Sequence, residues 1–265
     1  MGKSRTPVNV MLIRSTWTLT LSEPATIPRA YGLELVKDLH RRMSLPMGEE
    51  KIPTVTYSGI LGSYSGSKEF LTFSTDNFYQ LSLCGLQERA AKAISNLDLS
   101  PCLELFGAKF NIVNREDETS SYENLYQSLV ATEPEPNTQL KLKFLTPTTF
   151  AQQRTNLPLP IPLLMFRSWL ERWNCFAPVY LGGDELLAYL SDAIALKSHK
   201  IQTRLFSLPH GYVNGFTGNI TLQSLRNTEP LLANVANLLV AYAQFCGTGM
   251  KTRLGMGQTE IIVVK

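Results

Sequence analysis

The sequence predicts an α+β fold made of two consecutive β-α-β-β-α-β units. Strand-like and helix-like segments alternate in two series along the 265 residues, and a polar segment separates the two series. That segment, residues 114–137, begins with a charge cluster and ends in Glu-Pro-Glu-Pro-Asn, a composition typical of a connection. We therefore expect one domain over residues 1–130 and a second over residues 138–265.

The first series begins with residues 8–21, where β-branched and apolar residues mixed with Ser and Thr predict a strand. Residues 29–43 are predicted as a helix, because their apolar side chains recur at helical spacing on one face. We predict further strands over residues 52–60, 68–74, 78–84 and 103–113, with a helix over residues 87–96 before the last of them.

The second series repeats this order without visible sequence similarity to the first. A strand over residues 139–145 leads through the rigid connector Leu-Pro-Leu-Pro-Ile-Pro into a predicted helix. A long hairpin turns at Pro209, His210 and Gly211. The other predicted elements are helices over residues 163–173, 184–196 and 230–245, the hairpin strands 200–208 and 213–222, and a final strand over residues 260–264.

Composition narrows the functional classes. The net charge is +3 with 44% apolar residues, so the chain is mildly basic, which is compatible with RNA binding. It starts without a secretory signal and contains no apolar run long enough to span a membrane, so we expect a cytoplasmic protein without a membrane partner. Its cysteines are scattered and form no CxxC pair, and we expect neither a metal site nor a cofactor.

The most specific local feature is the glycine-rich segment Gly247–Gln258, GTGMKTRLGMGQ. Its glycines, Gly247, Gly249, Gly255 and Gly257, permit sharp turns and a close approach of the backbone to a ligand. Lys251 and Arg253 lie between them and can reach phosphates. The segment runs from a helix to a strand, so it fits neither Walker A nor the Rossmann fingerprint. The alternative is a flexible connection with glycine helix caps.

His40 lies at the border of the apolar face of the first predicted helix. Arg29 and Lys37 fall near it on a helical wheel, so cations beside His40 would hold a phosphate and lower the pKa of the imidazole. The alternative is a histidine packed at a helix end. His199 and His210 are interpreted as solvated loop residues, and the acidic cluster at residues 116–118 as a solvated loop.

The glycine-rich segment next to the C-terminus resembles the corresponding loop of the CRISPR-associated endoribonucleases that process repeat transcripts, a family within the repeat-associated RNA-binding superfamily with ferredoxin-like folds. RAYGLELVKDLHRRM is similar to the first helix of that family, and KIPTVTYSGILG to the strand after it. LKFLTPTTF and GFTGNITL resemble segments of its second domain. The similarity follows the chain in order, and the cyanobacterial branch resembles it most.

The resemblance implies two tandem ferredoxin-like domains and metal-independent cleavage of CRISPR repeat RNA, producing mature guide RNAs. The 2′-hydroxyl of the RNA would attack the adjacent phosphate, leaving a 2′,3′-cyclic phosphate and a 5′-hydroxyl. His40 matches the family histidine, a general acid or base, and Lys51 matches a lysine of some members that would stabilise charge on the phosphate. Arg29 is a further candidate catalytic contact. Some members carry a tyrosine in the middle of the first helix, where this chain has Leu35 and Val36; Tyr31 lies one turn earlier.

We expect RNA contacts from the glycine-rich segment and from Lys37, Arg41 and Arg204, with Arg167 and Arg172 as possible extensions of the basic surface. A CRISPR effector complex and a homodimer are additional candidate partners. The main alternative is a non-catalytic RNA-binding subunit of a CRISPR ribonucleoprotein, which would not need His40. A mononucleotide-binding enzyme is a more remote alternative.

Overall fold

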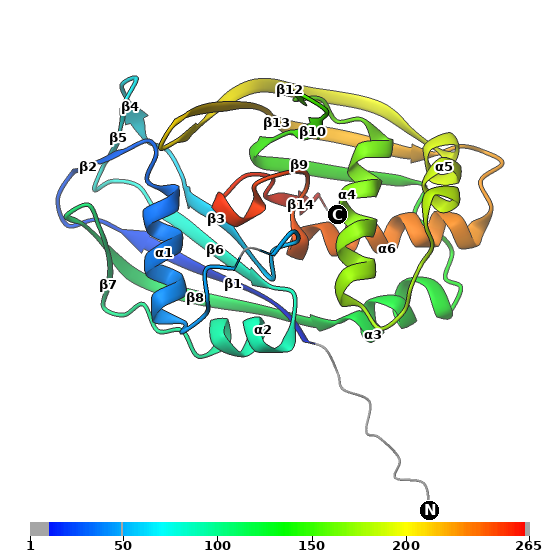
Figure 1. Cartoon of the computed structure of the whole chain (residues 1–265), viewed down its shortest axis with the longest axis horizontal. Coiled ribbons are helices and arrows are strands. Elements are labelled where there is room, and N and C mark those ends of the chain that lie inside the picture. Colours follow the sequence, from blue (N-terminus) through cyan, green and yellow to red (C-terminus); the bar gives the residue numbers. More distant parts are fainter. Residues whose placement is uncertain (1–10, 49, 263–265) are drawn as a thin grey trace, which may run out of the picture.

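The computed structural model describes residues 11–48 and 50–262, and it confirms an α+β fold (Figure 1). The first half of the chain forms a five-stranded sheet of order β3-β6-β1-β8-β7. Its strands are β1 (Met11–Thr20), β3 (Val55–Leu61), β6 (Tyr79–Gly85), β7 (Cys102–Leu105) and β8 (Ala108–Ser121). Helices α1 (Gly32–Arg42) and α2 (Glu88–Ser95) lie on one face of this sheet. Without the edge strand β7, the order is that of a ferredoxin-like β-α-β-β-α-β unit.

The second half repeats the same topology. Its four-stranded sheet has the order β12-β13-β9-β14. The strands are β9 (Gln139–Thr148), β12 (Ile194–Leu208), β13 (Gly211–Ser224) and β14 (Thr259–Ile261). The helices are α4 (Pro162–Phe176), α5 (Asp184–Ala193) and α6 (Pro230–Cys246). The predicted hairpin is confirmed, because β12 pairs with β13 in antiparallel register up to Leu208 and Gly211.

Several short elements were not predicted. A small three-stranded sheet joins β2 (Ala25–Pro28), β4 (Ser65–Gly66) and β5 (Phe70–Phe73), so the predicted strand over residues 68–74 lies outside the main sheet. A second small hairpin pairs β10 (Phe150–Gln152) with β11 (Thr155–Leu157). Helix α3 (Tyr122–Tyr126) and the π-helical turn η1 (Gln127–Ala131) follow β8. Residues 8–10 of the first predicted strand, and residues 263 and 264 of the last, lie outside the described residues.

Two loop predictions were wrong. The acidic cluster at residues 116–118 belongs to β8, where it pairs with residues 14–16 of β1. The strand therefore continues through a polar sequence, because the partner strand supplies its backbone hydrogen bonds while these side chains face solvent. His199 is likewise on β12 rather than in a loop, although its side chain is exposed, as predicted. His210 lies in the exposed turn between β12 and β13, as predicted.

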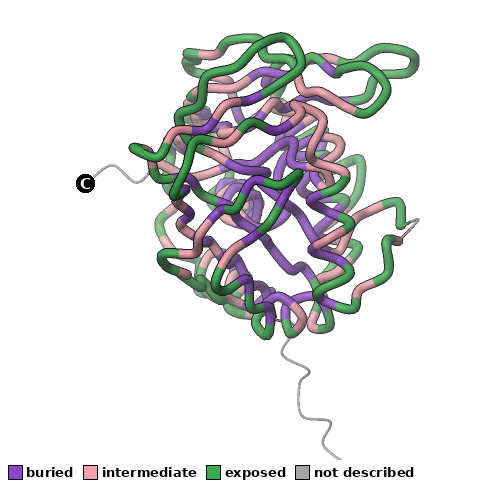
Figure 2. The backbone as a smooth tube through the Cα atoms, turned by 90° about the vertical axis from the view of Figure 1, so that its left-hand side faces the viewer, coloured by how far each residue is buried: buried purple, intermediate pink, exposed green. Residues whose placement is uncertain are grey.

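Each half has its own core, and a few residues of each half pack into the core of the other. Buried residues occupy the interior of the chain, and exposed ones follow the outer loops (Figure 2). Leu12 and Leu86 of the first half belong to the core of the second, and Leu254 of the second half packs against the core of the first. A buried hydrogen bond of 2.9 Å from Thr56 Oγ1 to the carbonyl oxygen of Phe245 also joins them. In the part of the chain that the structure describes, no helix is long and apolar enough to cross a membrane.

Candidate active site at the contact of the two halves

Helix α1 buries His40 at its C-terminal end. Leu35, Val36 and Leu39 form the buried face of the helix, and His40 follows on the border of that face. The side chain is more deeply buried than the wheel suggests, with 7% of the residue exposed. A buried imidazole needs partners for both ring nitrogens, so its surroundings determine its chemistry.

Only one of the two ring nitrogens has a partner. Nδ1 lies 3.0 Å from the carbonyl oxygen of Pro46. A carbonyl only accepts, so a neutral ring carries its proton on Nδ1, and Nε2 is left with a free lone pair. Nε2 is buried and has no hydrogen-bond partner among the described residues. Nε2 is therefore available to accept a hydrogen bond or a proton from a bound molecule.

The surroundings of His40 favour its neutral form. Burial is the largest cause that lowers its pKa below the usual 6.5, and the positive charge of Arg253 lowers it further. The carbonyl groups of Pro46 and Leu45 and the carboxylate of Glu50 act in the opposite direction. Burial outweighs them, so the ring is neutral at pH 7 and can accept a proton at Nε2.

Tyr57 is a second buried polar side chain beside His40. It projects from β3, and its ring centroid lies 5.9 Å from that of His40. Its hydroxyl is buried without a hydrogen-bond partner, and burial raises the pKa of Tyr57. The sequence did not point to Tyr57, because the family resemblance directs attention to the first helix instead.

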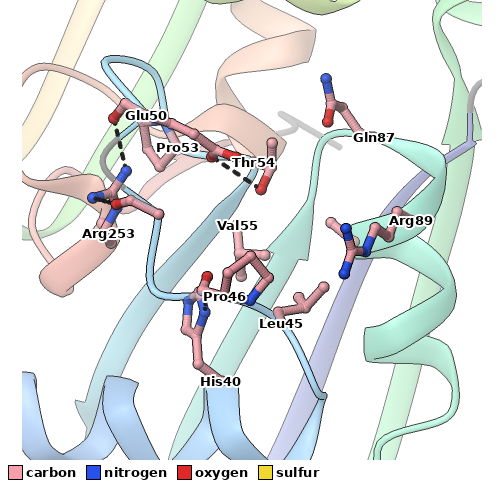
Figure 3. Close-up of a pocket in the computed structure, with 12 residues that line it drawn as sticks. His40, Leu45, Pro46, Glu50, Pro53, Thr54, Val55, Gln87, Arg89 and Arg253 are labelled. Carbon is pink, nitrogen blue, oxygen red and sulfur yellow. Dashed lines mark hydrogen bonds between the residues drawn. The ribbon is translucent and has the colours of Figure 1, made fainter.

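A small cavity opens beside His40. Its volume is about 110 Å³, and its lining includes His40, Val55, Gln87, Arg89 and Arg253. Figure 3 shows Arg253 and Arg89 on opposite sides of this cavity, reached from the glycine-rich segment and from α2 respectively. Arg89 belongs to the first turn of α2, far from His40 in sequence, and no motif could have linked the two. The cavity therefore joins a neutral imidazole to two cationic side chains.

The glycine-rich segment is packed rather than flexible. Gly249 and Gly257 have positive φ angles of 77° and 75°. A Cβ atom at these positions would lie 2.3 Å from the carbonyl oxygen of Thr149 and 2.0 Å from that of Thr248, respectively. These two glycines are therefore required by the packing of the backbone against itself. The other two, Gly247 and Gly255, are also buried with positive φ.

Two arginines hold this segment in place. Arg172 is buried and donates 2.6 Å hydrogen bonds to the carbonyl oxygens of Ser168 and Gly249. The prediction that Arg172 extends a basic surface was therefore wrong, because its guanidinium is occupied inside the second half. Arg253 donates to the carbonyl oxygens of Gly48 and Glu50 in the first half, over 2.6 and 2.8 Å. Lys251, in contrast, is half-exposed, and its side chain makes no hydrogen bond or ion pair with another described residue.

The other predicted catalytic residues do not meet at His40. Arg29 lines a separate, larger cleft of about 640 Å³, together with Tyr31, Arg204 and Gly255. There its Nε donates a 2.7 Å hydrogen bond to the carbonyl oxygen of Ser67. Lys51 is exposed and belongs to the lining of neither cavity.

The cations predicted on α1 form exposed ion pairs within the helix, and their RNA contacts stay a prediction. Lys37 forms an ion pair of 2.7 Å with Glu34, and Arg41 pairs with Asp38. The cation that acts on His40 is thus Arg253, rather than Arg29 or Lys37. Arg167 and Arg204 remain exposed on the second half. Across residues 11–48 and 50–262, no group of three or more His, Cys, Asp and Glu side chains is placed to hold a metal ion.

Comparison with known proteins bears on this arrangement. Residues 142–259 match the family model of the CRISPR-associated endoribonuclease Cas6. The resemblance to this family is confirmed. The match includes the glycine-rich segment up to Thr259 and does not reach His40. The branch of the Cas6 family stays a prediction.

Two curated relatives carry the same name. The Cas6 endoribonuclease of Mycobacterium tuberculosis strain H37Rv is 27% identical over 123 residues, which are 46% of this chain and 38% of the relative. That of Streptococcus thermophilus is 28% identical over 128 residues, 48% of this chain and 52% of the relative. The chain thus spans about half or less of the curated Cas6 relatives that it matches.

A solved Cas6 structure agrees over the whole fold. A Cas6 product complex superposes with a TM-score of 0.72 at 20% identity, covering 96% of this chain and 100% of the other. The superposition shows that this chain shares the fold of the Cas6 structure, and at 20% identity it shows the fold alone.

Proposed function

We propose that this protein is an endoribonuclease that cuts CRISPR repeat RNA and releases mature guide RNAs. The observation that carries the proposal is His40, a buried neutral imidazole with a free Nε2. It lies where two ferredoxin-like units meet, and the second of these units matches the Cas6 family model. A protein that only bound RNA would not need a proton-accepting imidazole at this place. The proposal keeps the two expected domains, with the catalytic histidine in residues 1–130 and the glycine-rich segment in residues 138–265.

The reaction proposed is an internal transesterification. The 2′-hydroxyl of the nucleotide before the cut attacks the phosphorus, the bond to the 5′-oxygen breaks, and a 2′,3′-cyclic phosphate and a 5′-hydroxyl result. Since Nδ1 is held by the carbonyl of Pro46, Nε2 is the atom that accepts the proton of the 2′-hydroxyl, which makes His40 a general base. The nucleophile belongs to the RNA, so the reaction requires no metal-activated water.

Cations would then stabilise the charge that develops on the phosphate. Arg89 lines the His40 cavity and is exposed, so it is better placed for this role than Lys51. Nε2 is buried in the free protein, so the walls of the cavity must rearrange when RNA binds. Catalytic contacts commonly form only in the complex with substrate, so the geometry of the free protein does not exclude His40 as the base. Arg29 and Arg204, which line the larger cleft, are proposed to contact the RNA away from the cut.

The proposal includes a cytoplasmic location, where repeat transcripts are made. Besides the RNA, the partners proposed are a CRISPR effector complex that receives the product and a second copy of the chain.

The test is single-turnover cleavage of labelled repeat RNA by the wild type, by His40→Ala and by the control His210→Ala, all in EDTA. His210 is an exposed histidine of the hairpin turn, so its removal controls for the loss of an imidazole. We expect His40→Ala to cut about 10²–10⁴-fold more slowly with nearly unchanged RNA affinity. Near-normal cutting by His40→Ala would contradict the role of His40. Binding without any cut by the wild type would instead favour a non-catalytic subunit. Products ending in a 3′-hydroxyl, or activity that needs magnesium, would contradict the mechanism.

A further inference from the structure

The Arg253 side chain crosses from the second half of the chain to the first. Its guanidinium donates one hydrogen bond to the carbonyl oxygen of Gly48 and another to that of Glu50, over 2.6 and 2.8 Å. These acceptors lie 205 and 203 residues away in sequence. Two parallel donations from one planar group fix both the position and the orientation of the backbone that accepts them.

The backbone that carries Arg253 is itself tightly held. Arg253 lies in the single 3₁₀ turn η2 (Thr252–Leu254), between Lys251 with φ 57° and Gly255 with φ 105°. Thr252 is buried, and a Cβ at Gly32 of α1 would come within 3.0 Å of the carbonyl oxygen of Leu254. The turn packs against β3 and α1 (Figure 1). The backbone position of Arg253 is therefore fixed by the packing of this turn.

The backbone that Arg253 holds is the one that orients His40. Pro46, two residues before Gly48, accepts from Nδ1 of His40 at 3.0 Å. The amide of Leu45 donates to the carbonyl oxygen of His40, over 3.0 Å, which ties the start of the same stretch to the end of α1. Displacing the carbonyls of Gly48 and Glu50 would therefore displace the acceptor that sets the tautomer and the orientation of the imidazole.

We propose that Arg253 is a positioning residue for His40, and that its guanidinium serves the backbone of the first half instead of an RNA phosphate. The inference rests on the proposed function, because it gives Arg253 a part in the same reaction. It also divides the roles of the two cations of the glycine-rich segment. Lys251 is free to bind phosphate, and Arg253 holds the site together.

The electrostatic surroundings of His40 provide a readout besides activity. The charged groups that act on the imidazole are Arg253 from η2 and Glu50 from the connection after α1, and Arg89 of α2 lines the same cavity. Tyr57 packs against the ring from β3. Removing the charge of Arg253 removes one cause that lowers the pKa of His40, so this pKa should rise. A lysine at this position keeps the charge, but its single nitrogen does not reproduce the two-point contact.

The experiment compares Arg253→Met and Arg253→Lys with the control Arg226→Met and with Lys251→Met. Arg226 is exposed in the turn before α6 and makes no ion pair with another described residue. For each variant we would measure the single-turnover rate at saturating repeat RNA, the affinity as a function of salt, and the titration of the His40 ring by NMR. Circular dichroism and thermal unfolding check the fold.

We expect Arg253→Met to bind RNA with the wild-type affinity and salt slope, and to cut up to about 100-fold more slowly, because a misplaced catalytic group costs rate rather than binding. Its His40 pKa should rise. Arg253→Lys should also cut slowly, while its His40 pKa should rise less than that of Arg253→Met, because the positive charge is kept. Lys251→Met should show the opposite pattern, with weaker binding and a salt slope reduced by about 0.7.

Wild-type cutting by Arg253→Met would overturn the inference. So would a loss of affinity and salt slope with a normal rate at saturation, because that pattern belongs to a phosphate contact. If Arg253→Met does not fold, Arg253→Lys carries the same comparison of rate with affinity. If the wild type itself cuts no repeat RNA, the proposed function fails, and the NMR titration then tests only whether Arg253 positions His40. Unchanged His40 signals in both Arg253 variants would overturn that positioning role.

Discussion

Replacing Gly257 by alanine tests whether the glycine-rich segment is shaped by packing or by a ligand. Gly257 has φ 75°, and a Cβ there would lie 2.0 Å from the carbonyl oxygen of Thr248. Holding an L-residue at positive φ costs about 1–2 kcal/mol. The overlap with Thr248 must be relieved by a backbone shift, which costs about 1–3 kcal/mol more. That shift also weakens the 2.8 Å hydrogen bond from the Thr248 amide to the Gly257 carbonyl, worth about 1 kcal/mol. The variant should lose about 3–6 kcal/mol of stability.

Gly211→Ala is the matched control for this substitution. Gly211 also has positive φ, 99°, yet nothing lies within 4 Å of a Cβ built there. It should lose only the conformational part, about 1–2 kcal/mol. Urea unfolding followed by circular dichroism gives the stability loss of each variant from the shift of its unfolding midpoint, provided that the variants and the wild type have the same m-value. If Gly257→Ala is no less stable than Gly211→Ala, the close approach to Thr248 does not shape the segment. A fully stable Gly257→Ala that no longer binds RNA would show that the glycine serves the ligand instead.

Two further predictions concern Lys251 and His40. Lys251 is a non-glycine residue at φ 57°, so Lys251→Gly should leave the unfolding free energy unchanged or raise it by up to about 1 kcal/mol. The RNA affinity of this variant and the salt dependence of that affinity should both fall. A loss of stability in urea unfolding would contradict this prediction. Because the pKa of His40 is lowered in the folded state, the unfolded chain binds a proton first as the pH drops. The stability contributed by neutral His40 is therefore complete above pH 6.5 and is lost below it, at no more than about 1.4 kcal/mol per pH unit, until the folded pKa is reached. His40→Gln should flatten that part of the stability curve, and an identical pH dependence in both proteins would refute the assignment.

The order of the main elements could be predicted from sequence, since apolar periodicity and turn residues are local signals. The extent of β8 could not. Its residues 114–121 are polar and resemble a linker, and they become a strand because β1 lies opposite them as far as the pair Met11 and Ser121. The small sheet of β2, β4 and β5 was missed for a similar reason, because short strands depend on neighbours that are remote in sequence.

The candidate site was predictable in part. His40 could be identified from its place on a helical face together with the family resemblance, and the structure places it beside a cavity. Its neighbours Tyr57 and Arg89 could not, because β3 and α2 approach α1 only in the folded sheet. Arg29 and Lys37 share the helical azimuth of His40, yet each finds a nearer partner of its own. A helical wheel shows which residues share a direction, but it does not show which acceptors compete for their side chains.

Arginines show why charge in a sequence overstates the surface available to RNA. A basic residue near a glycine-rich segment is naturally interpreted as a phosphate contact, because phosphate is the acceptor that sequence reasoning can anticipate. Backbone carbonyls are equally good acceptors for a guanidinium, and every residue carries one, so no motif reveals them. Arg172 and Arg253 both donate to backbone carbonyls. Arg172 fixes the glycine-rich segment within the second half, and Arg253 fixes it against the first half. If Arg253 serves the backbone as proposed, the cations available to RNA in and around the segment are Lys251 and, in the larger cleft, Arg29 and Arg204. Arg172 fixes the segment at Gly249, and Arg253 fixes it on the other side of Lys251, so the segment can present this lysine in a defined place and couple the position of the second half to His40.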